Sequence, residues 1–438
     1  MTNMKSISKI LKSKVLGRTA IASADQALTS LTNLGVTLLL LKLVPKIDFG
    51  YFNIVLTVTT YITWIQNAVV TTPLNVLLAS KNAAEEKIFS SALFKGQIVT
   101  ITFISIITVA VSLLVYFVFY NSFVLLVIAA ASFSLIGILS RSYFRQLSYA
   151  QELPQRALKQ DLIFTIFYFV FIGLTLLISK FNIVTVIIGM GVCNILVFTI
   201  YNIKESTKVH FSDLKSAYTE TWKFGRWSLI GITVTHLQTY SYQYLIAIML
   251  GSLAVADNSA SRLLMSPLVF MQAGWGSIIR PRGAKLREQN LLNKFFKELI
   301  LASITITVLI STYMIILYSA GDILQKFLFT DKYKDSMEYV FYWGGIFIFQ
   351  YIRANASFGL QVIKKFKNIA LINSFSMIIT IATSYLLILQ YQIKGALIAS
   401  ILGEIILGGL LWYFLHSYIK EKDPLQKNIF KFMSHKSE

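Results

Sequence analysis

Residues 225–285 have the sequence GRWSLIGITVTHLQTYSYQYLIAIMLGSLAVADNSASRLLMSPLVFMQAGWGSIIRPRGAK. The stretch contains two apolar segments, at 226–250 and 254–280, and each is long enough to cross a hydrocarbon core of roughly 30 Å. Arg262 lies within the second segment, and seven polar side chains lie within the first. These seven are His236, Gln238, Thr239, Tyr240, Tyr242, Gln243 and Tyr244. Since polar groups at membrane depth normally face a protein interior or a watery cavity, we predict a membrane hairpin that lines such a cavity.

Similar apolar segments recur along the whole chain. The 438 residues are 55% hydrophobic and 14% charged, whereas soluble domains contain about 25% charged residues. Hydropathy predicts about twelve membrane spans. Their predicted extents are 19–43, 50–79, 97–120, 122–146, 162–179, 183–203, 226–250, 254–280, 295–319, 337–363, 369–389 and 395–418. We therefore expect an all-α membrane protein with no separate soluble domain.

The basic residues are distributed unevenly among the connections between these spans. The sequence has 40 Lys and Arg against 20 Asp and Glu, a formal net charge of +20. With the N-terminus in the cytoplasm, about 31 basic residues lie in cytoplasmic segments and about seven lie outside. This positive-inside pattern predicts that both termini are cytoplasmic. It also accounts for the charge without a nucleic-acid partner.

A basic segment at 204–223 divides the predicted spans into two groups of six. Because each group has an even number of spans, both halves have the same orientation in the membrane. We predict an N-terminal six-helix lobe at 1–203 and a C-terminal six-helix lobe at 226–418. A cytoplasmic linker at 204–225 joins them, and a basic cytoplasmic tail follows at 419–438.

Polar side chains form helical stripes, mainly in the first two spans of each half. In the second span Asn53, Thr57, Thr60, Trp64 and Asn67 follow one another at steps of three or four, which places them on one helix face. Comparable stripes in the seventh and tenth spans are formed by His236, Thr239, Tyr240 and Gln243 and by Gln350, Arg353, Ser357 and Gln361. Such residues often form hydrogen bonds between membrane helices. Their concentration in corresponding spans favours a cavity between the two halves.

Four charged residues within the spans are candidates for a functional site. Arg262 lies about six residues from an external turn, so its side chain either extends to the water or faces the cavity. Arg353 is too deep to reach water easily, which favours a functional or an ion-paired role. Glu404 is a candidate partner for one of these arginines. Asp25 is either solvated from the cytoplasm or a proton or cation site.

The sequence lacks the motifs of common catalytic sites. It has no P-loop, no HExxH and no cluster of metal ligands, and it contains only four His and one Cys. A single cysteine, Cys193, excludes a disulfide framework. The external connections are too short for a large catalytic loop. We therefore expect neither an enzyme nor a cofactor, and Asp25 and Glu404 remain candidates for coupling to H⁺ or Na⁺.

Several short patterns occur together in residues 25–77 and in the hairpin. They are Gln26, Ser30, Thr32 and Asn33; Phe49, Gly50 and Phe52; Gln66, Asn67, Thr72, Pro73 and Leu74; Gly225, Arg226 and Trp227; and Pro281 and Arg282. In these patterns the chain resembles bacterial polysaccharide and O-antigen flippases of the multidrug/oligosaccharidyl-lipid/polysaccharide exporter superfamily. The resemblance implies two six-helix lobes that form a V around a central cavity in the bacterial inner membrane.

The resemblance also implies a cargo and a site. The cargo is a polyprenyl-pyrophosphate-linked oligosaccharide that moves from the cytoplasmic to the outer leaflet by alternating access, for cell-surface polysaccharide biosynthesis. Related flippases hold the pyrophosphate with intramembrane arginines, which assigns this role to Arg262 and Arg353. The remaining predicted cavity residues are Asn53, Thr57, Thr60, Trp64, Asn67, His236, Tyr240 and Gln243. The first two spans depart from the family pattern because they contain no arginine at membrane depth, only Asp25.

The predicted partners are membrane lipids, a polysaccharide polymerase and other glycan-assembly proteins. Two alternatives stay open. One is a cation-coupled multidrug antiporter of the same superfamily, which would have an acid-lined cavity. The other is a membrane-embedded glycan-assembly enzyme or scaffold. An enzyme of this kind would need a reactive carboxylate or histidine in an external loop.

Overall fold

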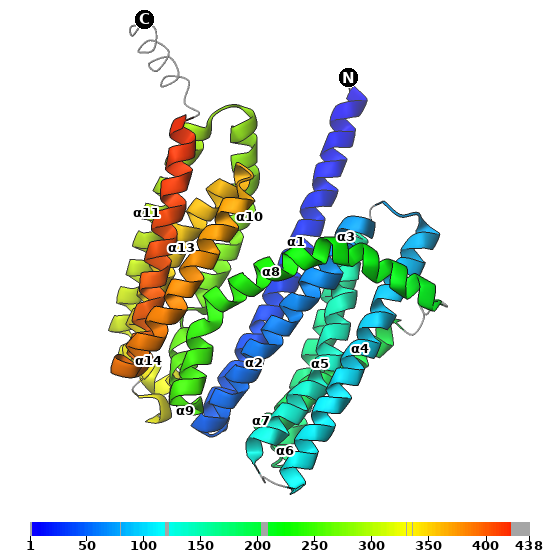
Figure 1. The fold of residues 1–438 in the computed structure, drawn as a ribbon, viewed down its shortest axis with the longest axis vertical. Helices are drawn as coiled ribbons and strands as arrows, with labels where there is room; N and C mark the ends of the chain where they lie inside the picture. The colour runs from blue at the N-terminus through cyan, green and yellow to red at the C-terminus, as the bar shows by residue number, and fades with distance from the viewer. Residues whose placement is uncertain are drawn as a thin grey trace, which may run out of the picture. The chain divides into compact units, whose positions relative to one another are not determined.

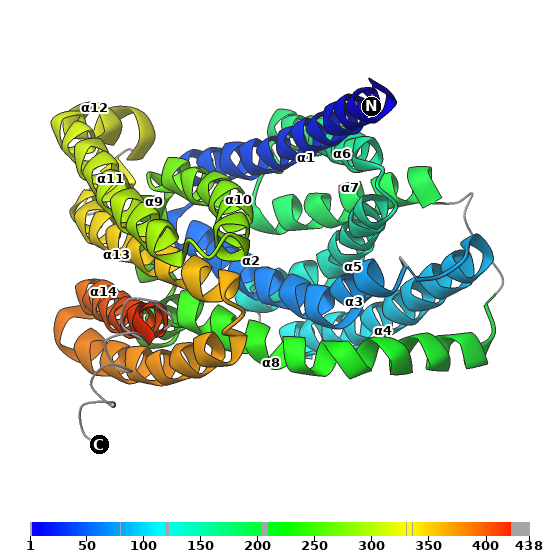
Figure 2. The ribbon, with the colours of Figure 1, turned by 90° about the horizontal axis from the view of Figure 1, so that it is seen from above.

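The computed structural model describes residues 2–78, 80–118, 122–202, 209–329, 331–334 and 336–421. All regular secondary structure in these ranges is helical. The chain divides into two compact units, Met1–Thr233 and Val234–Glu438. Figure 1 labels the helices of both units except α12, which is labelled in Figure 2.

Unit 1 contains seven α-helices and the first part of an eighth within the described residues. They are α1 (Thr2–Leu43), α2 (Lys46–Gln66), α3 (Thr72–Leu78), α4 (Ala83–Val118), α5 (Phe123–Ala150), α6 (Pro154–Leu177), α7 (Ile183–Asn202) and the start of α8 (Phe211–Leu250). Helix α5 is central, because it packs against α2, α4, α6 and α7. The backbones of α5 and α7 approach closely at Gly191, where a Cβ atom would lie 2.7 Å from the Cα atom of Ser134.

A π-helical turn, Asn67–Thr71, separates α2 from α3. The N–H of Thr72 donates to the carbonyl of Asn67, five residues earlier, as in a π-helix. Pro73 follows directly and has no N–H, so the regular i to i−4 pattern cannot continue through this point. The predicted span 50–79 therefore contains a local change of helical pitch.

Unit 2 begins with the second part of α8 and has six further α-helices in the described residues. They are α9 (Ser252–Leu263), α10 (Ser266–Glu288), α11 (Leu292–Ser319), α12 (Gly321–Leu324), α13 (Ser336–Val362) and α14 (Phe366–Glu421), with a π-helical turn at Gln325–Phe329 and a 3₁₀ turn at Asp331–Tyr333. Helix α13 packs against α9, α10, α11 and α14. A core of buried leucines, including Leu299, Leu407, Leu411 and Leu415, joins α11 to α14.

Two breaks in the helices of unit 2 bear on the predicted spans, one within a span and one between two spans. The span predicted at 254–280 is divided between α9 and α10, where Met265 donates to the carbonyl of Arg262 and Pro267 lies in the first turn of α10. Helix α14 has a non-helical residue, Gln392, with φ 52° and ψ −129°. This break falls between the predicted spans 369–389 and 395–418.

The predicted linker 204–225 is helical from residue 211 onward, as part of α8. Ala217, Thr221 and Gly225 recur every four residues along its buried side, and a Cβ atom at Gly225 would lie 2.9 Å from the Cα atom of Val69. The hydroxyl of Tyr218 donates to the Leu93 carbonyl of α4 at 2.9 Å. This part of α8 thus crosses α4 and the π-helical turn as a packed element of unit 1 (Figure 1 and Figure 2). Residues 203–208 and 422–438 of the predicted linker and tail lie outside the described residues.

The described residues contain eight helical segments that are long and apolar enough to cross a membrane. They are Ala20–Leu43, Lys46–Leu78, Ala83–Val118, Phe123–Ala150, Pro154–Leu177, Ile183–Tyr201, Leu292–Ser319 and Phe366–Lys420. In α4 the side chains of Val99, Phe103 and Ile106 are at least 60% exposed, as expected for a surface covered by lipid. The protein is thus a multi-pass membrane protein. Helices α8, α10 and α13 fall short of this apolar content, so the predicted count of twelve spans is not reached by composition alone.

Candidate functional site

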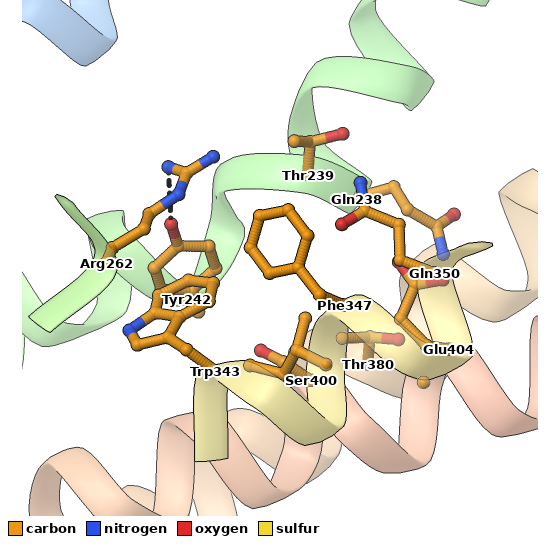
Figure 3. Close-up of a pocket in the computed structure, with 12 residues that line it drawn as sticks. Gln238, Thr239, Tyr242, Arg262, Trp343, Phe347, Gln350, Thr380, Ser400 and Glu404 are labelled. Carbon is orange, nitrogen blue, oxygen red and sulfur yellow. Dashed lines mark hydrogen bonds between the residues drawn. The ribbon is translucent and has the colours of Figure 1, made fainter. Parts of the chain in front are cut away.

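Unit 2 contains a polar pocket between α8, α9, α13 and α14 (Figure 3). Its volume is about 40 Å³. The lining residues are Gln238, Thr239, Tyr242, Arg262, Trp343, Ile346, Phe347, Gln350, Thr380, Ser400, Gly403 and Glu404. A water molecule needs roughly 10–15 Å³ on this measure, so the pocket has room for about three waters or for one small polar group.

Arg262 is held at the pocket by aromatic side chains. Its Nη1 donates to the hydroxyl of Tyr242 at 2.9 Å. The carbon atom of the guanidinium group lies 5.3 Å from the ring centroid of Trp343 and 5.5 Å from that of Tyr240. Both distances fall within the range of a cation–π interaction. The sequence left open whether this side chain extends to the water or faces a cavity, and the structure places it in the wall of the pocket.

Arg262 has no ion pair with a carboxylate in the described part of the chain. Aromatic rings and a phenol hydroxyl stabilise a guanidinium group, but they do not cancel its charge. A guanidinium group presents five N–H donors in a planar fork, and one of these already binds Tyr242. The pocket therefore offers positive charge and N–H donors to an anionic ligand.

Arg353 and Glu404 form an ion pair, with 2.5 Å between Arg353 Nε and Glu404 Oε2. The side chains are 21% and 14% exposed, so the pair is largely shielded from water. Glu404 lines the pocket, whereas Arg353 does not. The sequence interpretation of Glu404 as a partner for an arginine thus has a counterpart in the structure. Because each charge compensates the other, Arg262 is the lining cation that remains available for a ligand.

The residues of α8 that line this pocket overlap only at Thr239 with the stripe predicted for the cavity between the halves. Gln238, Thr239 and Tyr242 line the pocket. His236 is 1% exposed, and its Nε2 atom lies 2.9 Å from the hydroxyl of Tyr244. Gln243 is also buried, at 5% exposure. Neither His236 nor Gln243 is among the lining residues, and Tyr240 approaches the site through its contact with Arg262.

Four lining residues have no polar periodicity that could have identified them. Trp343 and Phe347, one turn apart on α13, supply aromatic surface, and Thr380 and Ser400 lie on the two parts of α14 on either side of Gln392. Short hydroxyl residues and aromatic residues are common in any membrane helix. Only the packing of α14 against α13 reveals their role.

The polar stripe of α2 forms hydrogen bonds mostly within its own helix. The Thr57 hydroxyl donates to the Asn53 carbonyl at 2.9 Å, and the Thr60 hydroxyl donates to the Leu56 carbonyl at 2.7 Å. Asn53 donates in the same way to the Phe49 carbonyl at 2.8 Å. These contacts satisfy the donors locally, and the role of the stripe in a cavity stays a prediction.

The π-helical turn gives the end of this stripe a similar arrangement. The Thr71 hydroxyl donates to Asn67 Oδ1 at 2.8 Å, four residues earlier. Trp64, the remaining member of the predicted stripe, is half-buried in α2. For these side chains too, the predicted contact with sugars stays a prediction.

Unit 1 contains a buried network of two carboxylates and two guanidinium groups. Arg145 Nη2 lies 2.6 Å from Asp25 Oδ2, and Arg145 Nε lies 2.8 Å from Asp161 Oδ2. Arg141 forms an ion pair with the other oxygen of Asp161. Tyr149 donates its hydroxyl to Asp25 Oδ2 at 2.5 Å. Asp25 is fully buried and its charge is compensated by Arg145, so the alternative of solvation from the cytoplasm is wrong, whereas its role as a proton or cation site stays a prediction.

The partners of Asp25 escaped prediction because they lie at the ends of predicted spans. Arg141 and Arg145 fall in the last turns of the span predicted at 122–146 and were counted among the cytoplasmic basic residues, and Asp161 lies one residue before the span predicted at 162–179. In the structure α5 extends to Ala150 and α6 begins at Pro154, so all three residues lie within helices. Tyr149, one helical turn beyond Arg145, was the residue from which the sequence could have indicated a polar network at this point.

The described residues contain no group of three or more His, Cys, Asp or Glu side chains that could hold a metal ion. Cys193 is buried in α7, at 2% exposure.

No family model matches this sequence, and no curated protein matches it. Solved structures do match. The inward closed conformation of the lipid II flippase MurJ is 16% identical, with a TM-score of 0.68, over 91% of this chain and 87% of that chain. The inward-facing conformation of a multidrug resistance MATE family transporter of the MOP superfamily is 12% identical, with a TM-score of 0.64, over 90% and 95%.

The chain shares the fold of these two transporters. A eukaryotic MATE transporter, AtDTX14, agrees with this assignment, at 13% identity and a TM-score of 0.60 over 94% of this chain and 99% of that chain. At these identities the similarity defines the fold and not the cargo. The same fold occurs in a lipid II flippase and in multidrug transporters, so it fits the flippase and the antiporter alternatives equally.

Proposed function

We propose that this protein is a flippase that moves a polyprenyl-pyrophosphate-linked oligosaccharide from the cytoplasmic to the outer leaflet of a bacterial inner membrane. In this proposal two six-helix lobes with cytoplasmic termini open alternately to each side. The observation that supports an anionic cargo is the environment of Arg262, a pocket-lining guanidinium group without a carboxylate partner among the described residues. The resemblance to polysaccharide flippases supports the glycan, and the fold shared with the lipid II flippase MurJ supports a lipid-linked substrate.

The pocket in unit 2 fits one part of such a cargo. Its volume of about 40 Å³ suits a single phosphoryl group and is too small for an oligosaccharide. Arg262 would bind phosphoryl oxygens through the N–H groups that Tyr242 does not use. Hydrogen bonds to a charged group contribute about 1.5–3 kcal/mol each. The amides of Gln238 and Gln350 would bind the first sugar, and the polyprenyl chain would stay in the lipid.

Transport outward would gain from the membrane potential. An anionic group that leaves a cell with a negative interior gains about 2.3 kcal/mol per charge for each 100 mV. Coupling to H⁺ is a further part of the proposal, because protonation of Glu404 would release the guanidinium group of Arg353 beside the pocket. Asp25 has an equivalent relation to Arg145 in unit 1.

The alternative of a multidrug antiporter is supported by the MATE transporters that share the fold. A cationic drug would, however, meet the uncompensated charge of Arg262, while the one carboxylate in the pocket is already paired with Arg353. The charge arrangement in unit 2 therefore favours the anionic cargo.

The test is glycan export in a flippase-deficient strain that expresses the full-length protein. Arg262→Gln removes the charge and retains a polar side chain, and we expect export to fall at least tenfold, as loss of one charge-assisted hydrogen bond implies. Arg262→Lys should restore only part of it, because an ammonium group cannot bind in a fork-like manner. Arg282→Gln is the matched control, since Arg282 is 55% exposed and pairs with Glu298 at the surface.

Export at the wild-type rate by Arg262→Gln, at equal protein abundance, would exclude the assignment of Arg262 to the cargo. Drug resistance conferred by the wild-type protein in place of glycan export would favour the antiporter.

A further inference from the structure

The pocket of unit 2 has a second polar feature besides Arg262, a wall formed by α8 and α14 that presents hydrogen-bond acceptors (Figure 3). Its polar residues are Gln238 and Thr239 on α8 and Thr380, Ser400 and Glu404 on α14. A hydroxyl group in such a wall can donate to a ligand only if its own proton is not already used. The hydrogen bonds of the two helices show where each proton lies.

The hydroxyl groups of this wall donate to backbone carbonyls of their own helices, four residues earlier. The pairs of hydroxyl and carbonyl are Thr239 with Thr235 at 2.8 Å, Thr380 with Ser376 at 2.8 Å and Ser400 with Ala396 at 2.9 Å. A hydroxyl group has one proton and two lone pairs, so each of these groups only accepts from a ligand while its bond to the carbonyl is made. The Glu404 carboxylate accepts from Arg353 and is likewise an acceptor.

The amide of Gln238 is oriented by a further hydroxyl group, that of Ser376. Ser376 is fully buried, and its hydroxyl donates to the Gly403 carbonyl at 3.3 Å, so it accepts from Gln238 and does not donate to it. Gln238 Nε2 donates to this hydroxyl at 3.3 Å, which directs the carbonyl end of the amide away from Ser376. Gln238 Oε1 is shielded from solvent and accepts no hydrogen bond from the described residues.

A buried acceptor without a donor is costly, and a ligand that supplies a donor removes this cost. The phosphoryl groups of a pyrophosphate diester do not supply one, because they have no proton at neutral pH. A small cation would satisfy acceptors, but the uncompensated guanidinium group of Arg262 disfavours it. The O–H and N–H groups of a sugar match the wall. Arg262 thus offers donors to the phosphoryl group, whereas the wall of α8 and α14 requires donors from the ligand.

We propose that this wall selects the cargo by its first sugar. The carbon next to the phosphate-bearing carbon of that sugar must carry an O–H or N–H group, and Gln238 Oε1 accepts its hydrogen bond. This substituent is the sugar donor nearest to the phosphoryl group, and a pocket of about 40 Å³ leaves no room for more distant parts of the sugar. The inference rests on the proposed function, since it takes the phosphoryl group as the ligand of Arg262.

Binding of short-chain probes to the detergent-purified full-length protein tests this proposal. The probes are citronellyl pyrophosphate, citronellyl-pyrophosphoryl glucose, and the same glucose probe with fluorine in place of the hydroxyl group on the carbon next to the phosphate-bearing carbon. Fluorine is close in size to a hydroxyl group but donates no hydrogen bond. We expect isothermal titration calorimetry to show about tenfold weaker binding of the fluoro probe, as loss of the donor to one buried acceptor implies.

Gln238→Met removes the acceptor and keeps the length of the side chain. We expect the affinity ratio between the hydroxyl and fluoro probes to fall from about ten to about one in this variant. The ratio separates recognition from a structural role, because a structural loss would weaken the binding of both sugar probes equally. Gln289→Met is the matched control, since Gln289 is exposed at the C-cap of α10, outside the pocket, and this variant should keep the wild-type ratio.

The outcomes separate this inference from the proposed function. Equal affinity of the wild type for the two sugar probes would overturn selection by a donor, while binding of the pyrophosphate at Arg262 would stand. A wild-type ratio that persists in Gln238→Met would overturn the assignment to Gln238. Absence of binding of all the probes would contradict the proposed function itself, and this inference with it.

Discussion

The buried ion-pair network of unit 1 gives the sharpest test of what stabilises this fold. Arg145 forms ion pairs with both Asp25 and Asp161, whereas Arg141 forms an ion pair with Asp161 and a hydrogen bond with the neutral side chain of Asn194. Arg145→Gln therefore leaves Asp25, which is fully buried, without a cation, while Asp161 keeps Arg141. Removing one partner of a buried pair typically costs about 3–5 kcal/mol, because the remaining charge stays uncompensated. We expect a loss of this size for Arg145→Gln and a smaller loss for Arg141→Gln.

The double variant Arg145→Gln, Asp25→Asn separates charge from packing. It removes the uncompensated carboxylate together with its partner, so the remaining pair of Arg141 and Asp161 is again neutral. We expect it to recover about 2–3 kcal/mol relative to Arg145→Gln alone, as a double-mutant cycle of directly contacting residues would give. The assay is the denaturation midpoint of the purified full-length protein in detergent. A double variant no more stable than Arg145→Gln would refute the reasoning, since packing loss would then explain the whole effect.

Two further substitutions test local features of the backbone. Gly191→Ala should lower the free energy of unfolding by about 1–3 kcal/mol in a thermal unfolding assay, because the new Cβ would lie 2.7 Å from Ser134 Cα. Gly173→Ala is the neutral control, since its Cβ would have nothing within 4 Å. Any loss of stability in the control would contradict this reasoning. Gln392→Gly should raise the free energy of unfolding by about 1 kcal/mol, and the thermal midpoint with it, since glycine adopts φ 52° without strain. An unchanged or lower midpoint would argue against strain at this residue.

The apolar helices were predictable because the signal lies in the sequence itself. Long runs of apolar residues define α4 and α5, and the break near Gln392 follows from the interruption of such a run by Gln390, Gln392 and Lys394. Hydropathy averages over a window, however, and cannot tell a charged residue at a helix end from one inside a helix. That is why Asp161 was missed and why α5 was predicted to end four residues too early, at 146 instead of Ala150.

The sequence pointed to a polar hairpin that contains Arg262, and both helices that flank the turn line the pocket of unit 2. Which residues of α8 line this pocket depends on packing against α13 and α14, which the sequence does not reveal. The cavity between the two halves, with His236 and Gln243 in its wall, stays a prediction. The ion pair between Arg353 and Glu404 also depends on the tertiary structure, because these residues are 51 positions apart in the sequence.

The first part of α8 was predicted as a linker because charged and polar residues interrupt its apolar ones. Its structure depends on small residues: Ala217, Thr221 and Gly225 let the helix approach α4 and the π-helical turn closely. Trp222 and Trp227 are 49% and 68% exposed on its other sides. Hydropathy gives no weight to such a pattern of small residues.

The π-helical turn Asn67–Thr71 has a consequence for the phase of the helix that contains it. Residues of an α-helix advance by about 100° each, so Gln66 and Leu74, eight positions apart, would differ by about 80° in an unbroken helix. The π turn absorbs one extra residue, which leaves the equivalent of seven α-helical steps, about 20° short of two full turns. Gln66 and Leu74 are accordingly both buried, at 5% and 0% exposure, and Leu74 joins the core around Tyr143. The extra residue thus brings α3 back into the helical phase of α2, so that both helices bury the same side.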